Sequence, residues 1–252
     1  APAPDAGLQV LTLRELTGVV GAHEWRKKGV LMPVLGKDAR IHPHYGVFSP
    51  VRGEYVGLVN EAPLPAGARE LAFDIGTGTG VLAALLAKRG VKRVVATDTS
   101  ARALVCAQDN IDRLGLSEKV ELQKTALFPE GQAALIVCNP PWVPGRAVTT
   151  LEQAVYDENS AMLRGFLSGL RAHLLPQGEG WLILSDLAEH LGLRTREELM
   201  GWIEAAGLYV VYRMDVKPEH GKASDATDPL HAARAAEVTS LWRLAAVAAD
   251  HA

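Results

Sequence analysis

This chain of 252 residues has few of the features that mark membrane proteins or strongly charged proteins. It contains no run of about 18 apolar residues, the length that crosses a bilayer as a helix, so we expect no membrane segment. The net charge is only −3. This value neither indicates nor forbids a nucleic-acid partner, because a local basic patch can bind phosphates on an acidic protein.

Cysteine is scarce, and the start of the chain shows no targeting pattern. Cys106 and Cys138 lie in a predicted helix and a predicted buried strand, and we interpret both as reduced core residues of a cytoplasmic protein. Residues 1–7 lack the basic start and apolar core of a signal peptide and are typical of a linker. The first residue is Ala1 instead of Met, so we expect further residues upstream.

Strand-like and helical patterns alternate between residues 70 and 245. This alternation indicates parallel βαβ units, and hence an α/β protein with a Rossmann-like, mostly parallel sheet of seven strands. No helical pattern separates the last two strands, so we expect the last strand to be antiparallel. The expected strands are 70–74, 92–97, 119–123, 133–138, 180–185, 208–216 and 237–244, and the expected helices are 79–89, 100–114, 159–174 and 195–206.

A glycine-rich segment follows the first strand of the alternating region. Asp74 lies at the carboxyl end of this strand, where open α/β sheets bind ligands. Gly76, Gly78 and Gly80 allow left-handed backbone angles and close approach of a bulky ligand before a helix begins near Val81. The spacing lacks the last glycine of dinucleotide-binding loops, and an Asp suits a cationic ligand better than a diphosphate. The segment therefore favours S-adenosylmethionine, which carries a sulfonium and an α-amino group.

Asp98 ends the next strand. An acidic residue at this distance from the glycine loop commonly accepts hydrogen bonds from the two ribose hydroxyls of a nucleoside. The alternative role is a helix N-cap, because Thr99, Ser100 and a helical pattern follow. We expect the glycine loop and Asp98 to bind a nucleoside together.

The tetrapeptide Asn139-Pro140-Pro141-Trp142 follows an apolar run that predicts a buried strand. An amide or aromatic amine nitrogen is a poor nucleophile, but two fixed acceptors on its N–H groups can draw it towards tetrahedral geometry. The Asn139 side-chain oxygen and the Pro140 carbonyl suit this role, since successive prolines stiffen the loop. Trp142 offers a flat face for stacking a planar group. The alternative is that Asn-Pro-Pro only terminates the strand.

Residues 69–186 resemble the small-domain superfamily of S-adenosylmethionine-dependent methyltransferases. The glycine loop and the Asn-Pro-Pro-Trp loop are most similar to those of the protein-glutamine N5-methyltransferases, with Trp in place of Tyr. The methyltransferases of guanine N2 in ribosomal RNA and of adenine N6 are also similar. The resemblance implies an enzyme that uses S-adenosyl-L-methionine to methylate a planar amide or exocyclic amine nitrogen, in a protein glutamine or in an RNA or DNA base.

The same resemblance implies the site residues. Residues 66–252 would form the methyltransferase domain, and residues 1–65 an extension of helix and hairpin that covers cofactor or substrate. The implied cofactor contacts are Asp74, Gly76, Thr77, Gly78, Thr79, Gly80, Asp98, Thr99, Leu127 and Asn139. The implied catalytic residues are Asn139, Pro140 and Trp142, with Phe48 and Pro141 as further substrate contacts. Phe48 belongs to a Gly-Val-Phe-Ser segment that resembles an element of the guanine enzymes.

One departure from the family affects the cofactor site. Ala126 stands where relatives carry an Asp that binds the adenine amine, so we expect adenine recognition to depend on Thr125, backbone groups or packing against Leu127.

Two other functions stay open, a nicotinamide-dependent Rossmann oxidoreductase and a non-catalytic relative that keeps the cofactor. The absence of the last glycine of the G-x-G-x-x-G spacing argues against the oxidoreductase. The intact Asp74, Asp98 and Asn139 argue against the non-catalytic relative. We expect no metal, because no cysteine or carboxylate framework supports His42 and His44 with His220 or His231. Arg26-Lys27-Lys28 is interpreted as a solvated surface. The loop at 217–236 is either a cover over the substrate or a polar surface loop.

Overall fold

The computed structural model describes residues 13–51, 53–145, 156–217 and 231–248. The helices are α1 (Leu13–Lys28), α2 (Glu54–Glu61), α3 (Val81–Lys88), α4 (Ala101–Arg113), α5 (Ala161–His173), α6 (Leu187–His190), α7 (Arg196–Ala205) and α8 (His231–Ala236), with short 3₁₀ helices η1 (Pro33–Leu35) and η3 (Glu158–Ser160). The strands are β1 (Val30–Leu31), β2 (Arg40–Ile41), β3 (Leu71–Ile75), β4 (Arg93–Asp98), β5 (Val120–Lys124), β6 (Ala133–Cys138), β7 (Leu174–Ser185), β8 (Leu208–Val216) and β9 (Thr239–Ala246).

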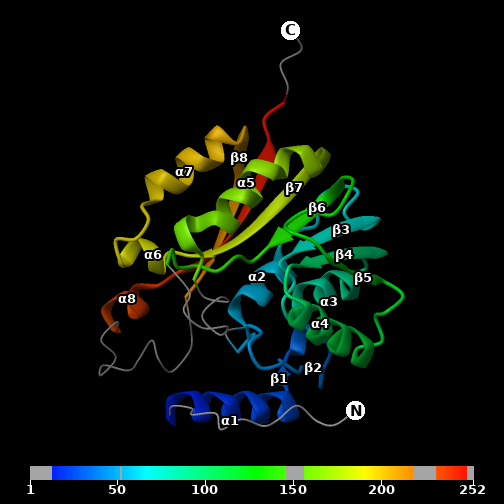
Figure 1. Ribbon diagram of the computed structural model, residues 1–252. Helices are drawn as coiled ribbons and strands as arrows, with labels where there is room; N and C mark the ends of the chain where they lie inside the picture. The colour runs from blue at the N-terminus through cyan, green and yellow to red at the C-terminus, as the bar shows by residue number, and fades with distance from the viewer. Residues whose placement is uncertain (1–12, 52, 146–155, 218–230, 249–252) are drawn as a thin grey trace, which may run out of the picture.

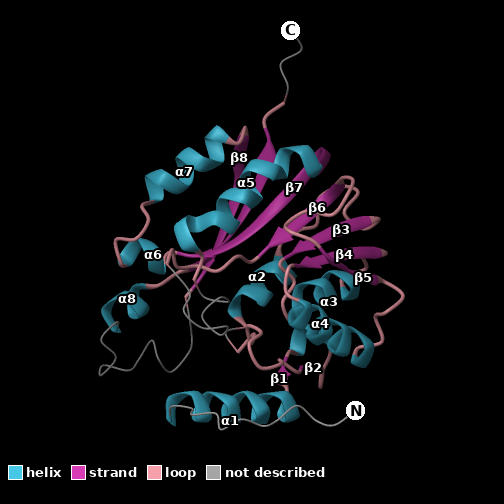
Figure 2. Cartoon of the chain, in the orientation of Figure 1, coloured by secondary structure: helices cyan, strands magenta, loops and turns pink. Residues whose placement is uncertain are grey.

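A seven-stranded sheet in the order β5-β4-β3-β6-β7-β9-β8 forms the centre of the molecule. Its strands are parallel except β9, which runs antiparallel to β7 and β8. Helices lie on both faces of the sheet, with α3 and α4 on one side and α5 and α7 on the other (Figures 1 and 2). The prediction of a seven-stranded α/β sheet with an antiparallel last strand is confirmed.

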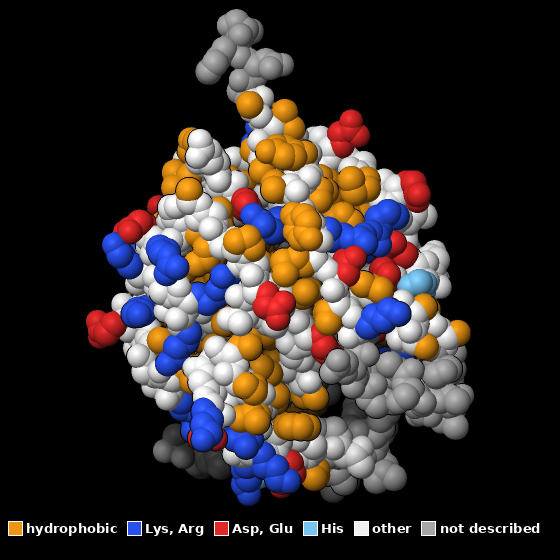
Figure 3. Space-filling view, turned by 180° about the vertical axis from the view of Figure 1, so that it is seen from behind, with side chains coloured by type: hydrophobic (Ala, Val, Ile, Leu, Met, Phe, Trp, Pro, Cys, Tyr) orange, Lys and Arg blue, Asp and Glu red, His pale blue; other side chains and the backbone are white. Residues whose placement is uncertain are grey.

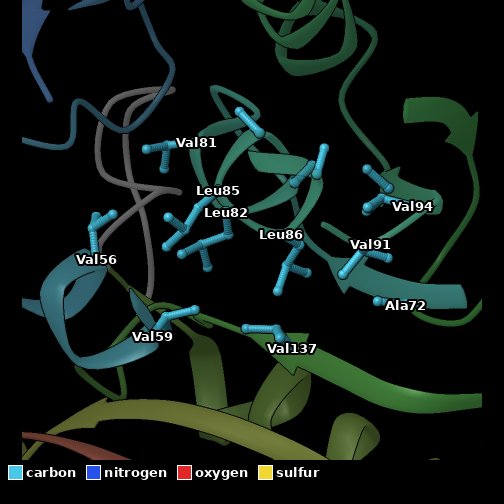
Figure 4. Close-up of a cluster of buried hydrophobic side chains, with 14 of the residues drawn as sticks. Val56, Val59, Ala72, Val81, Leu82, Leu85, Leu86, Val91, Val94 and Val137 are labelled. Carbon is cyan, nitrogen blue, oxygen red and sulfur yellow. The ribbon is translucent and has the colours of Figure 1, made fainter. Parts of the chain in front are cut away.

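Each face of the sheet buries its own apolar cluster. One cluster joins Leu82 and Leu86 of α3 to strand residues such as Val94 and Val137 (Figure 4). The other contains buried side chains of α5 and α7, including Phe166. Burial of each large apolar side chain contributes roughly 1.5–3 kcal/mol, so the two clusters hold the strands and their loops in place.

The segment before the sheet packs into the α3 cluster as well. Val56 and Val59 of α2 face α3 (Figure 4). Both terminal nitrogens of Arg89 donate hydrogen bonds to carbonyls at the end of α2, to Val59 and Ala62, each at 2.6 Å. The division of the chain at residue 65 stays a prediction, but described residues on its amino-terminal side share one core with the sheet.

Helix α1 spans 16 residues and ends at Lys28. Basic residues in the last turn interact favourably with the helix dipole, and Gly29, at φ +68°, ends the helix. Arg40 also donates hydrogen bonds to the carbonyls of Lys28 and Gly29. These contacts come from the following hairpin, so the helical pattern alone did not reveal them.

Strand β7 begins at Leu174, six residues before the predicted start at 180. Pro176 and Gly178 lie in this stretch, and the structure accommodates them through an irregularity in the pairing with β6. Ala133 pairs with Leu174 and Leu135 pairs with Glu179, so the register shifts between the two pairs.

The described part of the chain contains no helix that is long and apolar enough to cross a membrane. Cys106 and Cys138 are both free and buried, as predicted for core residues.

Candidate functional site

The two sequence motifs meet at the carboxyl edge of the sheet. Strands β3 and β6 are parallel neighbours, and Ile75 pairs with Cys138. The next residues, Gly76 and Asn139, therefore begin their loops side by side, about 4.8 Å apart in the direction of the strand hydrogen bonds. The strand order reverses between β3 and β6, which makes this edge a topological switch point where α/β sheets bind ligands.

Asp74 is buried, with only 1% of its surface exposed, and its carboxylate stabilises the glycine loop. One carboxylate oxygen accepts hydrogen bonds from the Thr77 hydroxyl at 2.7 Å and from the Ala83 N–H at 3.0 Å. Burial, aided by the charge of Asp98, raises the pKa of Asp74 to about 6, although the two hydrogen bonds act in the opposite direction. No cation is among the described groups that shift this pKa, so the carboxylate favours a cationic ligand.

The predicted left-handed angles occur at all three glycines of the loop. A Cβ at Gly80 would lie 3.2 Å from the Cβ of Ala107, so glycine allows α3 and α4 to pack closely there. At Gly78 the nearest atoms would lie 4.0 Å from such a Cβ. Gly78 therefore leaves room beside the loop for a Cβ, and its φ of +56° is the reason for glycine at this position.

Asp98 lies beside Gly78 and is half-buried. Its two oxygens accept hydrogen bonds from the backbone N–H groups of Gly78 at 3.0 Å and Ser100 at 2.8 Å. The N-cap of α4 is Ser100, whose hydroxyl accepts from Ala103, so the alternative role of Asp98 as N-cap is wrong. Each carboxylate oxygen keeps a free lone pair, which matches two ribose hydroxyls.

Thr97 connects the loops around the expected nucleoside site, a role that sequence reasoning missed. Its hydroxyl donates a hydrogen bond of 2.6 Å to the carbonyl of Leu127, and its own carbonyl accepts from Thr77 at 2.8 Å. Leu127 has a left-handed backbone with φ +61°, and its side chain packs against α5. Thr99 and Ala126 are exposed beside these residues. A hydroxyl residue at the end of an apolar strand was the only sequence signal for this connection.

Asn110 of α4 is a second residue that sequence reasoning missed. This fully buried side chain donates to the carbonyls of Thr79 at 3.0 Å, Cys106 at 3.0 Å and His42 at 3.3 Å, and accepts from the His42 N–H at 2.7 Å. It therefore joins the amino-terminal segment to the glycine loop. The available signal was an amide on the apolar face of a helix.

Replacing Asn110 with Ala is expected to lower the free energy of unfolding by about 2 kcal/mol, because buried groups of His42 and Thr79 lose their partner. Thermal or urea unfolding measures the loss. Gln108→Ala on the exposed side of the same helix is the matched control, with an expected change within about 0.5 kcal/mol. Equal unfolding midpoints for the two variants would show that the hydrogen bonds of Asn110 do not stabilise the fold.

The Asn-Pro-Pro-Trp loop contains an internal hydrogen bond. The indole N–H of Trp142 donates to the side-chain oxygen of Asn139 at 2.8 Å. This bond fixes which end of the Asn139 amide is oxygen, and it leaves the second lone pair of that oxygen free. Pro140 is buried, Pro141 is half-buried, and Trp142 packs against both core clusters. The loop is therefore held in place on the sheet.

The segment around Phe48 lies next to the glycine loop. Val47 is buried with two residues of α4, and its side chain comes within 4.0 Å of the position that a Cβ of Gly78 would take. Phe48 is half-buried and packs against the α3 cluster. The buried hydroxyl of Ser49 has no hydrogen-bond partner in the described part of the chain.

Two further groups complete the surroundings of the loop. Asp157 caps α5, accepting hydrogen bonds from the N–H groups of Met162 and Leu163, and its own N–H donates to Val143 beside the loop. A Cβ at Gly76 would collide with the side chain of Met162, so α5 reaches the start of the glycine loop.

No group of three His, Cys, Asp or Glu side chains that could hold a metal occurs among the described residues. His220 and the side chain of His231, which were weighed as metal ligands, lie outside the described part, as does most of the loop at 217–236.

The chain is similar in sequence to known glutamine methyltransferases. The release factor glutamine methyltransferase of Cereibacter sphaeroides is 32% identical over 183 residues, covering 67% of this chain and 61% of that protein. The corresponding protein of Moorella thermoacetica is 41% identical over 143 residues, which are 54% of this chain and 50% of that protein. The ribosomal protein uL3 glutamine methyltransferase of Bordetella pertussis is 37% identical over 105 residues, which are 40% of this chain and 35% of that protein. The chain thus spans about half the length of the curated relatives it matches.

Solved structures share the fold. A ribosomal protein L11 methylase from Lactobacillus delbrueckii subsp. bulgaricus aligns with a TM-score of 0.55 at 19% identity, over 84% of this chain and 88% of that chain. A geranyl diphosphate methyltransferase solved in complex with SAM aligns with a TM-score of 0.58 at 13% identity, over 78% of this chain and 86% of that chain.

A family model for the methyltransferase small domain matches residues 38–195. The match includes both the glycine loop and the Asn-Pro-Pro-Trp loop. The predicted resemblance is confirmed, and the chain belongs to the methyltransferase small domain family.

Proposed function

We propose that this protein is an S-adenosylmethionine-dependent N-methyltransferase that acts on a planar amide or exocyclic amine nitrogen. The observation that carries the proposal is the pairing of Ile75 with Cys138, because it puts the glycine loop directly beside the Asn-Pro-Pro-Trp loop. A loop that only terminates a strand would not need an internal hydrogen bond that orients its Asn.

The residues at the glycine loop fit S-adenosylmethionine. Asp74 supplies a buried negative charge without a cationic partner in the described chain, which suits the positive charges of this cofactor. Gly78 leaves room beside the loop, and Asp98 keeps lone pairs for the ribose hydroxyls. Leu127 and the exposed Thr99 would border the adenine. When bound, the cofactor supplies an electrophilic methyl group on its sulfonium.

Asn139 and Pro140 would prepare the nitrogen for attack. The free lone pair of the Asn139 oxygen and the Pro140 carbonyl would accept the two N–H hydrogens of the substrate, which reduces delocalisation of the nitrogen lone pair. That lone pair would then attack the methyl group that the bound cofactor supplies, and the nitrogen would lose a proton to water. Both acceptors are held before substrate arrives, so the loop contributes orientation as well as electrostatic stabilisation.

Protein glutamine is the acceptor that we propose first. The curated relatives described above are named as methyltransferases of glutamine in release factors and in ribosomal protein uL3. A glutamine side chain ends in a planar primary amide, which offers two N–H hydrogens to the two acceptors of the loop.

Replacing Trp142 with Phe is expected to lower the rate of methyl transfer about tenfold, because Phe keeps an aromatic face but cannot orient the Asn139 amide. The rate constant under saturating cofactor and substrate measures this effect. Trp202→Phe, a half-buried tryptophan on α7, is the matched control. If Trp142→Phe retains the full rate, the indole N–H has no part in positioning Asn139.

Calorimetric titration tests the cofactor class. S-adenosylhomocysteine, the demethylated product of the cofactor, should bind the purified protein with a single saturating isotherm, whereas NADH should produce no saturation. Saturation by NADH at micromolar levels, without binding of S-adenosylhomocysteine, would support the oxidoreductase alternative instead.

A further inference from the structure

A pocket outside the proposed active site is lined only by basic side chains. Its volume is about 330 Å³, and the lining residues are His23, Arg26 and Lys27 of α1, His42 after β2, and Arg113 at the end of α4. These residues come from three separate segments of the chain. The run Arg26-Lys27-Lys28 alone predicted only a solvated surface, because neither His42 nor Arg113 is near it in sequence.

Two of the three permanent positive charges of this basic pocket have no acidic partner in the described part of the chain. Lys27 and Arg113 have no hydrogen bond or ion pair in the described part of the chain. Arg26 approaches one carboxylate, that of Asp109, at 3.9 Å, but the same oxygen is 2.9 Å from the ring of His44. Convergence of like charges is unfavourable in the free protein, so a bound anion would relieve the repulsion.

Hydrogen bonds hold the walls of the basic pocket together. A ring nitrogen of His42 donates to the carbonyl of Arg26 at 2.8 Å, which ties α1 to the hairpin. The backbone N–H of His42 donates to Asn110 on α4, one turn before Arg113. The pocket is therefore organised before a ligand arrives, unlike a set of independent surface lysines.

We propose that this pocket binds a phosphate group of a nucleic-acid backbone. Arg and Lys are the side chains that bind phosphates in proteins, and two histidines add further hydrogen-bond donors. The basic surface continues beyond the pocket through the exposed Arg40, as a chain of phosphates requires, whereas Lys28 is paired with Glu24 at 3.6 Å. Figure 3 shows Lys and Arg side chains grouped at the lower end of the molecule, where Figure 1 places α1.

The charge that would attract an anion is confined to this part of the surface. The whole chain has a net charge of −3, so this attraction is local to the pocket.

The position of the pocket suits docking of a large substrate. Arg113 lies six residues along α4 from Ala107, which packs against Gly80, a separation of about 9 Å along the helix axis. A nucleic-acid strand held at the basic pocket would therefore lie close to the glycine loop. The inference concerns binding alone and does not depend on methyl transfer, since a glutamine in a protein–RNA particle and a base in RNA are both compatible with it.

Binding of a fluorescent single-stranded RNA of about 20 nucleotides tests the proposal, with anisotropy measured between 0.05 and about 0.2 M salt. The double variant Lys27→Ala/Arg113→Ala should weaken binding about tenfold or more at 0.1 M salt and reduce the slope of log K against log[salt] by about 2. The matched control Lys88→Ala/Lys119→Ala removes the same charge from exposed positions elsewhere and should leave both quantities near wild type.

Competition with labelled RNA by two other anions tests which kind of anion the basic pocket binds. Polyglutamate of similar length should compete at least tenfold less well than unlabelled RNA, and inorganic phosphate should compete only at millimolar concentration. Equal salt slopes for the two double variants would overturn the proposal. Equal competition by polyglutamate, or saturation of the pocket by free phosphate without any RNA binding, would overturn its assignment to a nucleic-acid backbone.

Discussion

Replacing Asn139 with Ala is expected to lower the rate of methyl transfer by about 100-fold or more, because a preorganised polar group at a reacting centre typically contributes this much. The side chain is half-buried, and its only hydrogen bond within the described chain is the one from Trp142. Loss of that bond costs about 1 kcal/mol of stability, so the fold should persist. Initial rates with labelled methyl donor measure the loss.

The control for this substitution is Asn60→Ala, an exposed asparagine on α2. It should leave rate, cofactor affinity and unfolding midpoint unchanged. In Asn139→Ala, affinity for S-adenosylhomocysteine should stay within a few-fold of wild type, so that the defect lies in the chemical step. Near-wild-type turnover in this variant would remove the proposed role of the loop.

Replacing Asp74 with Asn is expected to weaken cofactor binding by roughly 100-fold, because the site loses the negative charge that faces a cationic ligand. Asn keeps an oxygen that can accept from Thr77 and Ala83, so the loop should keep its shape. Calorimetric titration measures the affinity. Unchanged affinity would show that Asp74 serves only to brace the loop.

The same substitution has an opposite effect on stability. The pKa of Asp74 is about 6 in the folded protein, mainly because of burial, and ordinarily 3.8. The folded state therefore holds this proton more tightly than the unfolded state, and unfolding free energy falls as pH rises from about 4 to 6. Asp74→Asn removes this loss, so above pH 6 it should be more stable than wild type by up to about 3 kcal/mol.

Urea unfolding at pH 5 and pH 8 tests this sign. The stability difference between Asp74→Asn and wild type should be larger at pH 8. The exposed Asp38→Asn in the hairpin turn is the matched control, and it should show no such dependence. A variant that is less stable than wild type at pH 8 would contradict the desolvation of Asp74.

Local patterns predicted the elements that depend on local physics. Strand β8 has the predicted bounds, and α3 begins at Val81 because Gly80, at φ +80°, can turn the chain there. Buried parallel strands appear in the sequence as apolar runs, and ligand-binding loops appear as glycine-rich segments. Both can therefore be recognised in a single sequence.

Contacts between distant segments left weaker signals. Asn110 resembles any polar residue in a helix until His42 and Thr79 are placed beside it. The hydrogen bond from Trp142 to Asn139 is local, but the pattern indicated only an aromatic face, because loop geometry decides where the indole N–H points. The basic pocket joins α1 to the end of α4, and sequence reasoning could not bring these segments together.

Transfer of a radiolabelled methyl group tests the central claim most directly. The purified protein is incubated with labelled S-adenosylmethionine and a lysate lacking the protein, and the labelled macromolecules are then treated with protease or ribonuclease. Our account predicts label on the lysate macromolecules that depends on Asn139 and is released by protease, with label in methylated glutamine after acid-free digestion. Label released by ribonuclease would show that the methyl acceptor is a nucleobase instead of glutamine. Binding of the cofactor without any methyl transfer would contradict the account.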